Sequence, residues 1–245
     1  MGLVQGATEF LPVSSSGHLT LMARICGSES SMYFDLILHV ASALSIVVVF
    51  KKEIVEIIKQ PFGKKCVALI VSTTLSGIMV ILLKDFVEGF FDGKYLPLFF
   101  IITAVLLVLG SKINIRVQKN VTMLDAAIVG ITQGLALFPG LSRSGVTTTT
   151  LSLLGVNKEE GMSYSFIMSL PLIFGSTILG IGESSSLSVS FSVLLVGFVT
   201  AFLSGLIALK IFKKIFVKKN ATPFIIYLTL LSIIILVNDT ILHIF

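Results

Sequence analysis

Charged residues are scarce in this sequence. Asp, Glu, Lys and Arg make up 13% of its 245 residues, about half of the ~25% typical of a soluble domain. Hydrophobic residues reach 55%, and the mean hydropathy is +1.03. Such a chain has too little polar surface to stay dispersed in water, which predicts an all-α polytopic membrane protein. The net charge of +5 does not indicate a nucleic-acid partner, because the basic residues lie between apolar segments.

Cysteine is also rare. Cys26 and Cys66 are far apart and have neither disulfide nor metal-ligand spacing, so we expect two reduced packing residues. The N-terminus lacks the positively charged region of a secretory signal peptide, so we expect no cleavable leader. The chain opens inside an apolar stretch, and we therefore expect a few residues to be missing before Met1.

Six apolar segments are long enough to cross a bilayer, which takes about 20 residues. Their expected bounds are 33–50, 66–84, 95–113, 162–181, 190–209 and 222–244. Two further stretches, 2–26 and 124–154, are apolar but are interrupted by polar breaks at 12–18 and 139–145. Backbone groups freed by Pro or Gly must be buried in protein or line a wet cavity. We therefore predict that both stretches are re-entrant helix-turn-helix hairpins.

Basic residues set the expected orientation. Thirteen of the 18 Lys and Arg residues lie in three loops, at 51–65, 112–119 and 210–219. The positive-inside rule places these loops in the cytoplasm. Both termini then lie outside the cytoplasm, and the first hairpin enters from the outside while the second enters from the cytoplasm.

An internal repeat relates the two halves at an offset of 128 residues, as from Gly17 to Gly145. Each half has one hairpin and three crossings, over 1–120 and 121–245. Three is an odd number, so the second half is expected to be inverted, with the polar tips meeting near the bilayer midplane. The matched residues are Gly2, Gln5, Gly6, Phe10, Ser14, Ser16 and Gly17 with Gly130, Gln133, Gly134, Phe138, Ser142, Ser144 and Gly145.

The first break carries ionisable residues, which are expensive inside a membrane and by default functional. Glu9 follows Gln5 by one helical turn, so both side chains share a face. The carboxylate can hold a divalent cation or act as a base. His18 can be a general acid, a general base or a nucleophile to phosphorus, and the Ser14–Ser16 run offers hydroxyl donors or a nucleophile.

Arg143 is the residue of the second break that most clearly indicates a function. Its guanidinium offers five donors in a rigid fork that suits phosphate oxygens. The neighbouring glycines let backbone N–H groups approach an anion at the start of the next helix. A carboxylate with a cation, an arginine and backbone amides together favour phosphoryl transfer.

These residues resemble the two motifs of the bacitracin-resistance family of undecaprenyl-diphosphate phosphatases. The first motif is carried by Gln5, Glu9, Phe10, Leu11, Pro12, Val13, Ser14, Ser15, Ser16, Gly17 and His18. The second is carried by Pro139, Gly140, Ser142, Arg143, Ser144, Gly145 and Thr147. The resemblance implies hydrolysis of a polyprenyl diphosphate to the monophosphate in the cell membrane. That reaction recycles the lipid carrier of cell-wall glycan synthesis and gives bacitracin resistance.

The same resemblance implies roles for individual residues. Glu9, Ser15, His18 and Arg143 would be catalytic, with His18 as proton carrier or nucleophile and Ser15 as its partner. A divalent cation, Mg²⁺ or Ca²⁺, would be held by Glu9, with Gln5 as a second ligand in doubt because other members carry Glu there. A homodimer is left open. The side chains expected to bind the diphosphate are Ser14, Ser16, Ser142, Arg143, Ser144 and Thr147.

The main alternative is a transporter or flippase of the polyprenyl phosphate carrier, because inverted repeats with broken helices are a transporter device. A pure carrier needs Arg143 but has little use for a proton-transfer pair such as Glu9 and His18. His39 lies inside a crossing without a motif around it, and we read it as a packing residue.

Overall fold

The computed structural model describes residues 1–27, 32–112, 118–183, 189–217 and 220–244. Every element named in this part of the chain is helical. The helices are α1 (Gly2–Phe10), α2 (Ser15–Cys26), α3 (Met32–Val49), α4 (Lys51–Lys59), α5 (Lys64–Glu88), α6 (Leu96–Lys112), α7 (Met123–Leu135), α8 (Arg143–Leu153), α9 (Lys158–Ile167), α10 (Ser169–Glu183), α11 (Phe191–Val217), α12 (Thr222–Val237) and the π-helical turn η1 (Asn238–Leu242). Parts of two predicted basic loops, 113–117 and 218–219, lie outside the described residues.

The expected crossings all fall on helices, but fewer pass as full spans. Within the described residues, four helices are long and apolar enough to cross a membrane: Lys64–Glu88, Lys158–Gly180, Phe191–Phe216 and Thr222–Leu242. Helices α3 and α4 pass the same test only when taken together, and the chain bends by 79° between them. The crossing expected at 95–113 is α6, whose 17 residues extend only about 26 Å at 1.5 Å per residue. The structure therefore establishes a multi-span helical protein.

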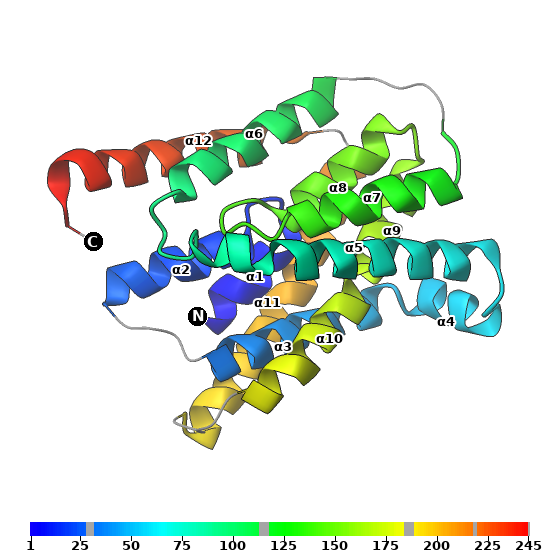
Figure 1. Ribbon diagram of the computed structural model, residues 1–245, viewed down its shortest axis with the longest axis horizontal. Coiled ribbons are helices and arrows are strands. Elements are labelled where there is room, and N and C mark those ends of the chain that lie inside the picture. Colours follow the sequence, from blue (N-terminus) through cyan, green and yellow to red (C-terminus); the bar gives the residue numbers. More distant parts are fainter. Residues whose placement is uncertain (28–31, 113–117, 184–188, 218–219, 245) are drawn as a thin grey trace.

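Both interrupted stretches form two helices joined by a non-helical break. Residues 2–26 give α1 and α2, and residues 124–154 fall on α7 and α8. Figure 1 shows these four helices in the middle of the molecule, with α6 and α12 along one edge and α3, α10 and α11 on the other side. The breaks therefore lie inside the protein, as the cost of exposing free backbone to lipid requires.

Close helix contacts fix the two hairpins on long helices of the opposite half. Helix α1 packs on α11, and α7 packs on α5. A Cβ atom at Gly6 would lie 2.1 Å from the carbonyl oxygen of Ala201, and one at Gly134 would lie 2.3 Å from Cβ of Met79. Only glycine allows such an approach.

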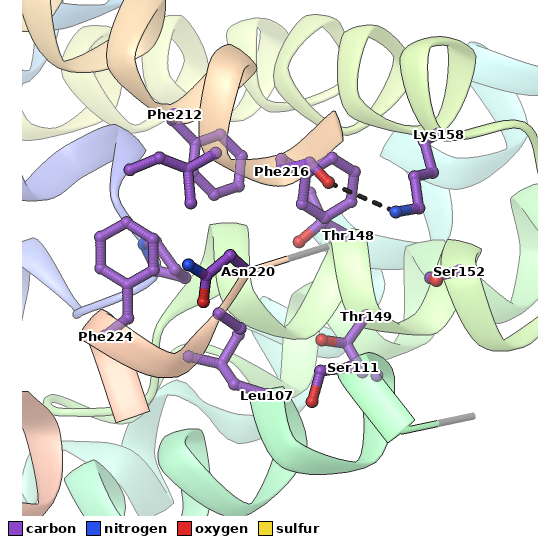
Figure 2. Close-up of a pocket in the computed structure, with 14 residues that line it drawn as sticks. Leu107, Ser111, Thr148, Thr149, Ser152, Lys158, Phe212, Phe216, Asn220 and Phe224 are labelled. Atoms are coloured by element: carbon purple, nitrogen blue, oxygen red, sulfur yellow. Dashed lines mark hydrogen bonds between the residues drawn. The ribbon is translucent and has the colours of Figure 1, made fainter. Parts of the chain in front are cut away.

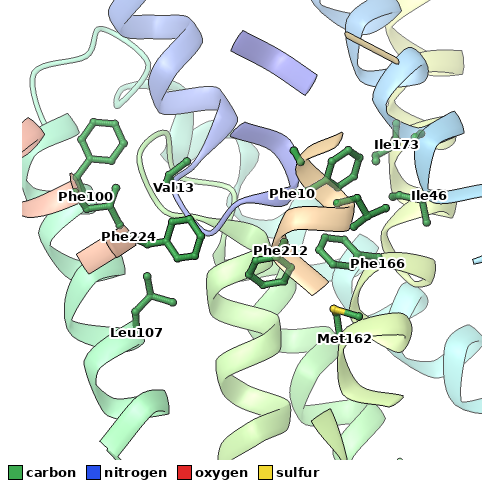
Figure 3. Close-up of a cluster of buried hydrophobic side chains, with 14 of the residues drawn as sticks. Phe10, Val13, Ile46, Phe100, Leu107, Met162, Phe166, Ile173, Phe212 and Phe224 are labelled. Atoms are coloured by element: carbon green, nitrogen blue, oxygen red, sulfur yellow. The ribbon is translucent and has the colours of Figure 1, made fainter. Parts of the chain in front are cut away.

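Aromatic side chains fill the space beside the first break. Phe10 lies edge-on to Phe166, with 5.6 Å between ring centroids, and Phe166 lies edge-on to Phe212 at 5.8 Å. Figure 3 shows these rings with Ile46 and Met162 in one cluster. The cluster joins α1, α3, α9 and α11, so it holds the end of α1 that carries Glu9.

Replacing Gly6 with Ala should lower stability by about 1–3 kcal/mol, because the added methyl group overpacks the contact between α1 and α11. The measurement is a thermal melt of the purified protein in detergent. Gly89→Ala is the matched control, since a Cβ there meets no atom within 4 Å. An unchanged melting temperature for Gly6→Ala would show that the two helices are not in close contact.

Candidate active site

The two breaks meet each other inside the bundle. The backbone N–H of Gly140 donates to Oγ of Ser14 at 3.1 Å, and Oγ of Ser144 donates to the carbonyl oxygen of Leu11 at 3.2 Å. The backbones touch as well, because a Cβ at Gly17 would lie 2.8 Å from Cα of Gly140. The predicted meeting of the tips is therefore present in the structure.

Local sequence explains the shape of the first break. Pro12 cannot continue α1, and Leu11 before it is extended, with φ −68° and ψ 144°. Ser14 then takes a left-handed φ of 69°, which is uncommon for a residue with a side chain. Its Oγ accepts the N–H of Gly17 at 3.3 Å and so begins α2. Strained backbone of this kind concentrates at functional sites.

The second break ends in the same way. Oγ of Ser142 accepts the N–H of Gly145 at 3.1 Å and caps α8. The first residue of each helix after its cap is therefore Ser15 in α2 and Arg143 in α8. Both helices direct their positive N-terminal ends at the same place, which favours an anion there.

Glu9 is the centre of the site. It is buried, with 5% of its surface exposed. Its Oε1 is ion-paired with the guanidinium of Arg143. Its Oε2 accepts from Oγ of Ser15 at 2.5 Å and from Nε2 of Gln5 at 3.0 Å. A buried carboxylate with a cationic partner and two further donors is stabilised in its ionised form.

His39 is the residue that sequence reasoning missed. Its Nε2 lies 3.9 Å from Oε2 of Glu9, and its Nδ1 lies 2.8 Å from the carbonyl oxygen of Asp35. His39, read from the sequence as a packing residue, thus lies beside the central carboxylate and in the wall of the cavity described below. The available signal was its position as an ionisable residue within an apolar crossing.

A cavity of about 520 Å³ lies against this cluster. Its polar wall comes from both breaks and includes Glu9, Ser14, Ser15, Ser16, Ser142 and Arg143, with His39 and Gln133 beside them. Its apolar wall comes mainly from α5 and α10. The volume is within the range of about 300–1,000 Å³ that is usual for ligand sites. Most of the predicted site residues are thus brought to one cavity.

His18 is placed elsewhere. It is buried and is absent from the cavity wall. Its Nδ1 lies 2.7 Å from the carbonyl oxygen of Ser14, and its Nε2 lies 2.6 Å from Oη of Tyr227. The ring stacks on Tyr227 and meets Phe100 edge-on. In this structure His18 ties α2 to α12, and both of its nitrogens are engaged.

Three other predicted residues also lie behind the cavity wall. Thr147 is 1% exposed and bonds to the carbonyl oxygen of Arg143 at 2.9 Å and to Oγ of Ser165 at 2.5 Å. Ser144 is held by Leu11, and Gln5 is fully buried behind Glu9. Direct diphosphate contacts from Thr147 and Ser144 therefore do not match their positions, because their hydroxyls already bond to protein atoms that hold Arg143 and the two breaks in place.

The donor set near Glu9 suits a cation only in part. Among the described residues, no group of three or more His, Cys, Asp or Glu side chains could hold a metal ion. Glu9 supplies a carboxylate, and Oε1 of the neighbouring Gln5 is buried without a hydrogen-bond partner. Mg²⁺ commonly takes one or two carboxylates and completes its shell with substrate phosphates and water. The residues therefore fit a cation only where a bound ligand supplies most of its oxygen atoms.

A second hollow, of about 50 Å³, lies on the other side of Pro12. Figure 2 shows Thr148 and Thr149 opposite Phe212 and Phe216, with Lys158 donating to the carbonyl oxygen of Phe216 at 3.4 Å. Its lining has no residue in common with the wall of the larger cavity. The larger cavity alone joins Glu9, Ser15 and Arg143, so it is the candidate active site.

Comparisons with known proteins agree along the chain. The family described as bacitracin resistance protein BacA matches residues 1–234. The undecaprenyl-diphosphatase of Methanosphaera stadtmanae is 35% identical, over 99% of this chain and 97% of its own length. That of Carboxydothermus hydrogenoformans is 37% identical over 97% and 94%, and that of Thermosipho africanus is 38% identical over 96% of each chain. The similarity thus spans both halves and both breaks.

Proposed function

The chain belongs to the bacitracin resistance protein BacA family, and from this premise we propose that it hydrolyses undecaprenyl diphosphate to undecaprenyl phosphate and inorganic phosphate. The protein is a membrane phosphatase that recycles the lipid carrier of cell-wall glycan synthesis, and this recycling underlies bacitracin resistance. One observation supports the assignment most: Glu9 of one break is ion-paired with Arg143 of the other at the wall of a cavity.

We place the diphosphate between the N-terminal ends of α2 and α8. Two helix ends offer backbone N–H groups, and the Arg143 guanidinium adds donors in a fork that matches phosphate oxygens. Ser14, Ser16 and Ser142 also line the cavity at these ends. The bound diphosphate would compete with Glu9 for the Arg143 guanidinium. The weakened ion pair would leave the Glu9 carboxylate available for proton transfer.

Ser15 is our candidate nucleophile because its hydroxyl lines the cavity and donates to Glu9 at 2.5 Å. Oγ of Ser15 would attack the terminal phosphorus while its proton moves to Glu9. The bond from that phosphorus to the bridging oxygen breaks, and undecaprenyl phosphate leaves with the electron pair. Water then attacks the phosphoserine, and Glu9 returns its proton to Oγ of Ser15. One proton of the water stays on the released phosphate, and the other passes to solvent.

A divalent cation, Mg²⁺ or Ca²⁺, is part of the proposal. Glu9 would hold it together with the diphosphate oxygens. When bound, it would supply neutralisation of the charge that develops on the leaving phosphate. In this proposal Gln5, which is buried behind Glu9 and absent from the cavity wall, orients that carboxylate through its amide and is not a ligand of the cation.

We further propose six crossings and two re-entrant hairpins in an inverted repeat. Equivalent helix contacts in the two halves support the inverted repeat. A Cβ at Gly2 would meet Oγ1 of Thr200, and one at Gly130 would meet the backbone of Ser72. Both pairs differ by 128 in each member, so each hairpin rests on the corresponding helix of the other half. Such an exchange is expected of two units related by a two-fold axis in the membrane plane.

In the proposed orientation the basic loops are cytoplasmic and both termini lie outside, in the cell membrane. One end of the substrate cavity then lies on the outer side, since its lining residue Phe91 follows α5 in the loop that carries Asp92. The transporter alternative gains no support from the relatives, which are named as diphosphatases. A pure carrier would also leave the Ser15–Glu9 pair unexplained.

The purified protein in detergent should release inorganic phosphate from undecaprenyl diphosphate. Removal of divalent cations with a chelator should stop the release, and added Mg²⁺ or Ca²⁺ should restore it, because a cation held by Glu9 and the diphosphate would neutralise charge on the leaving phosphate. A colorimetric phosphate assay is sufficient. No release by the wild type, combined with lipid translocation in liposomes, would contradict the phosphatase assignment, whereas release without any cation would contradict only the metal requirement.

A further inference from the structure

The cavity above Glu9 and Arg143 reaches the surface between α5 and α10. Ile81 of α5 and Leu179 of α10 line the cavity, yet 70% and 73% of their surfaces are exposed. A residue that both lines a cavity and is exposed marks the rim of its opening. Both rim residues are apolar and belong to candidate membrane spans. This side of the opening therefore faces the hydrocarbon of the bilayer, whereas Phe91, which also lines the cavity and is 49% exposed, lies in the loop after α5.

The two ends of the cavity differ in chemistry. The inner end holds the ionic cluster of Glu9 and Arg143, and the outer end is formed by Val80, Ile81, Leu172 and Leu179. This is the profile of a site for an amphiphile, with its anionic head inside and its apolar chain toward the rim. A cavity of about 520 Å³ accommodates a ligand of drug size. A long polyprenyl chain is larger, so most of it must lie outside the protein.

Two glycines stand in the walls of this opening. Gly77 of α5 and Gly175 of α10 line the cavity, and a Cβ at either would meet no atom within 4 Å. Packing therefore does not require glycine at these positions, in contrast to Gly6. Glycine inside a helix costs about 0.5–1 kcal/mol relative to alanine. Each glycine leaves its part of the cavity wall without a side chain.

The internal repeat allows Gly77 to be compared with its counterpart in the second half. Gly205 occupies the position of Gly77 in the second half, 128 residues later. A Cβ at Gly205 would lie 2.8 Å from Oγ of Ser45 and 2.9 Å from the ring of Phe10. The corresponding space in the second half is therefore filled, and only the first half leaves it open. A structural requirement of the repeated unit would have given both glycines the same surroundings.

We propose that the polyprenyl chain of the substrate leaves the cavity between α5 and α10, across Gly77 and Gly175, and that these two glycines determine which lipid chains enter. The inference rests on the proposed function. It assigns no chemistry to the glycines: they set the width of the passage, while the breaks bind the diphosphate. A side chain at either position narrows the passage without touching Glu9, Ser15 or Arg143.

Gly77→Leu and Gly175→Leu test the passage with two substrates. For undecaprenyl diphosphate, each variant should raise KM by about tenfold or more with little change in kcat. Dimethylallyl diphosphate has a single isoprene unit that stays inside the cavity, so its hydrolysis should be unchanged. Ile78→Phe is the matched control, because it adds bulk to the same helix at a half-exposed position outside the cavity wall. An equal loss of kcat/KM with both substrates, or no loss with either, would contradict the proposed passage.

Reversible chemical labelling of the passage separates its effect on activity from misfolding of a variant. Gly175→Cys is introduced with Cys26→Ser and Cys66→Ser, and the purified protein is treated with a benzyl thiosulfonate reagent. Hydrolysis of undecaprenyl diphosphate should fall by about tenfold and should return when a reductant removes the label. Full activity of the labelled protein would overturn the proposal. Inactivity of the unmodified wild type would instead count against the proposed function, so the two failures are distinguishable.

Discussion

Glu9→Gln is expected to lower the kcat of phosphate release by about 10²–10⁴-fold, the range usual for loss of a general base. The amide keeps the shape of the carboxylate but cannot take the proton of Ser15, which now donates to Glu9 at 2.5 Å. It also cannot neutralise Arg143. The measurement is steady-state phosphate release in detergent, with circular dichroism to show that helix content is unchanged.

The matched control is Glu88→Gln, which removes an exposed carboxylate at the end of α5. Its activity should equal that of the wild type. If Glu9→Gln retained normal kcat while the control behaved as expected, Glu9 would be a structural partner of Arg143 and the base would have to be sought among the other cavity residues.

Arg143→Lys is expected to lower kcat/KM by about 10³-fold or more, comparable to the loss of an arginine that stabilises transferred phosphoryl groups. Lysine keeps the charge but has no planar fork, so it cannot bind two phosphate oxygens at once. Arg143 is also the first residue of α8, so its backbone N–H and its side chain act at the same point. The substitution removes only the side-chain fork.

Chemical rescue separates catalysis from folding in this case. Arg143→Ala should be inactive, and added guanidinium at low, non-denaturing concentration should restore part of the activity. Lys84→Ala, which removes an exposed cation from α5, should behave as wild type with or without guanidinium. An Arg143→Lys protein with unaltered kcat/KM would show that charge alone, rather than the geometry of the fork, is needed at this position.

The contact between the two breaks could be predicted from the sequence alone. The 128-residue offset pairs Ser14 with Ser142, and both serines cap the helix that follows them. Local chemistry explains this success: Pro ends one helix, Ser begins the next, and free backbone cannot face lipid. The membrane class followed from the composition, whereas the ion pair between Glu9 and Arg143 is a finding of the structure.

Other features depend on tertiary packing and could not be predicted. His18 belongs to a motif, unlike His39, but its hydrogen bonds to Ser14 and Tyr227 direct its ring away from the cavity. His39 has no motif, yet the packing of α3 on α1 brings it to Glu9. The direction of a side chain about a helix break depends on neighbours from distant parts of the sequence, such as Phe100 and Tyr227 for His18. Crossing lengths were also misjudged, as α11 continues to Val217 beyond the expected end at 209.

The packing of α1 on α11 has a consequence for biosynthesis. Helix α1 packs on α11, which begins at Phe191 and is therefore synthesised about 180 residues after α1. Until that helix and α8 have been made, Glu9 has neither its aromatic support nor Arg143, and a lone carboxylate in lipid is costly. The nascent hairpin must therefore wait at the translocon or at the water interface. Assembly of the catalytic centre therefore follows the synthesis of both α8 and α11, which supply Arg143 and the packing surface of α1.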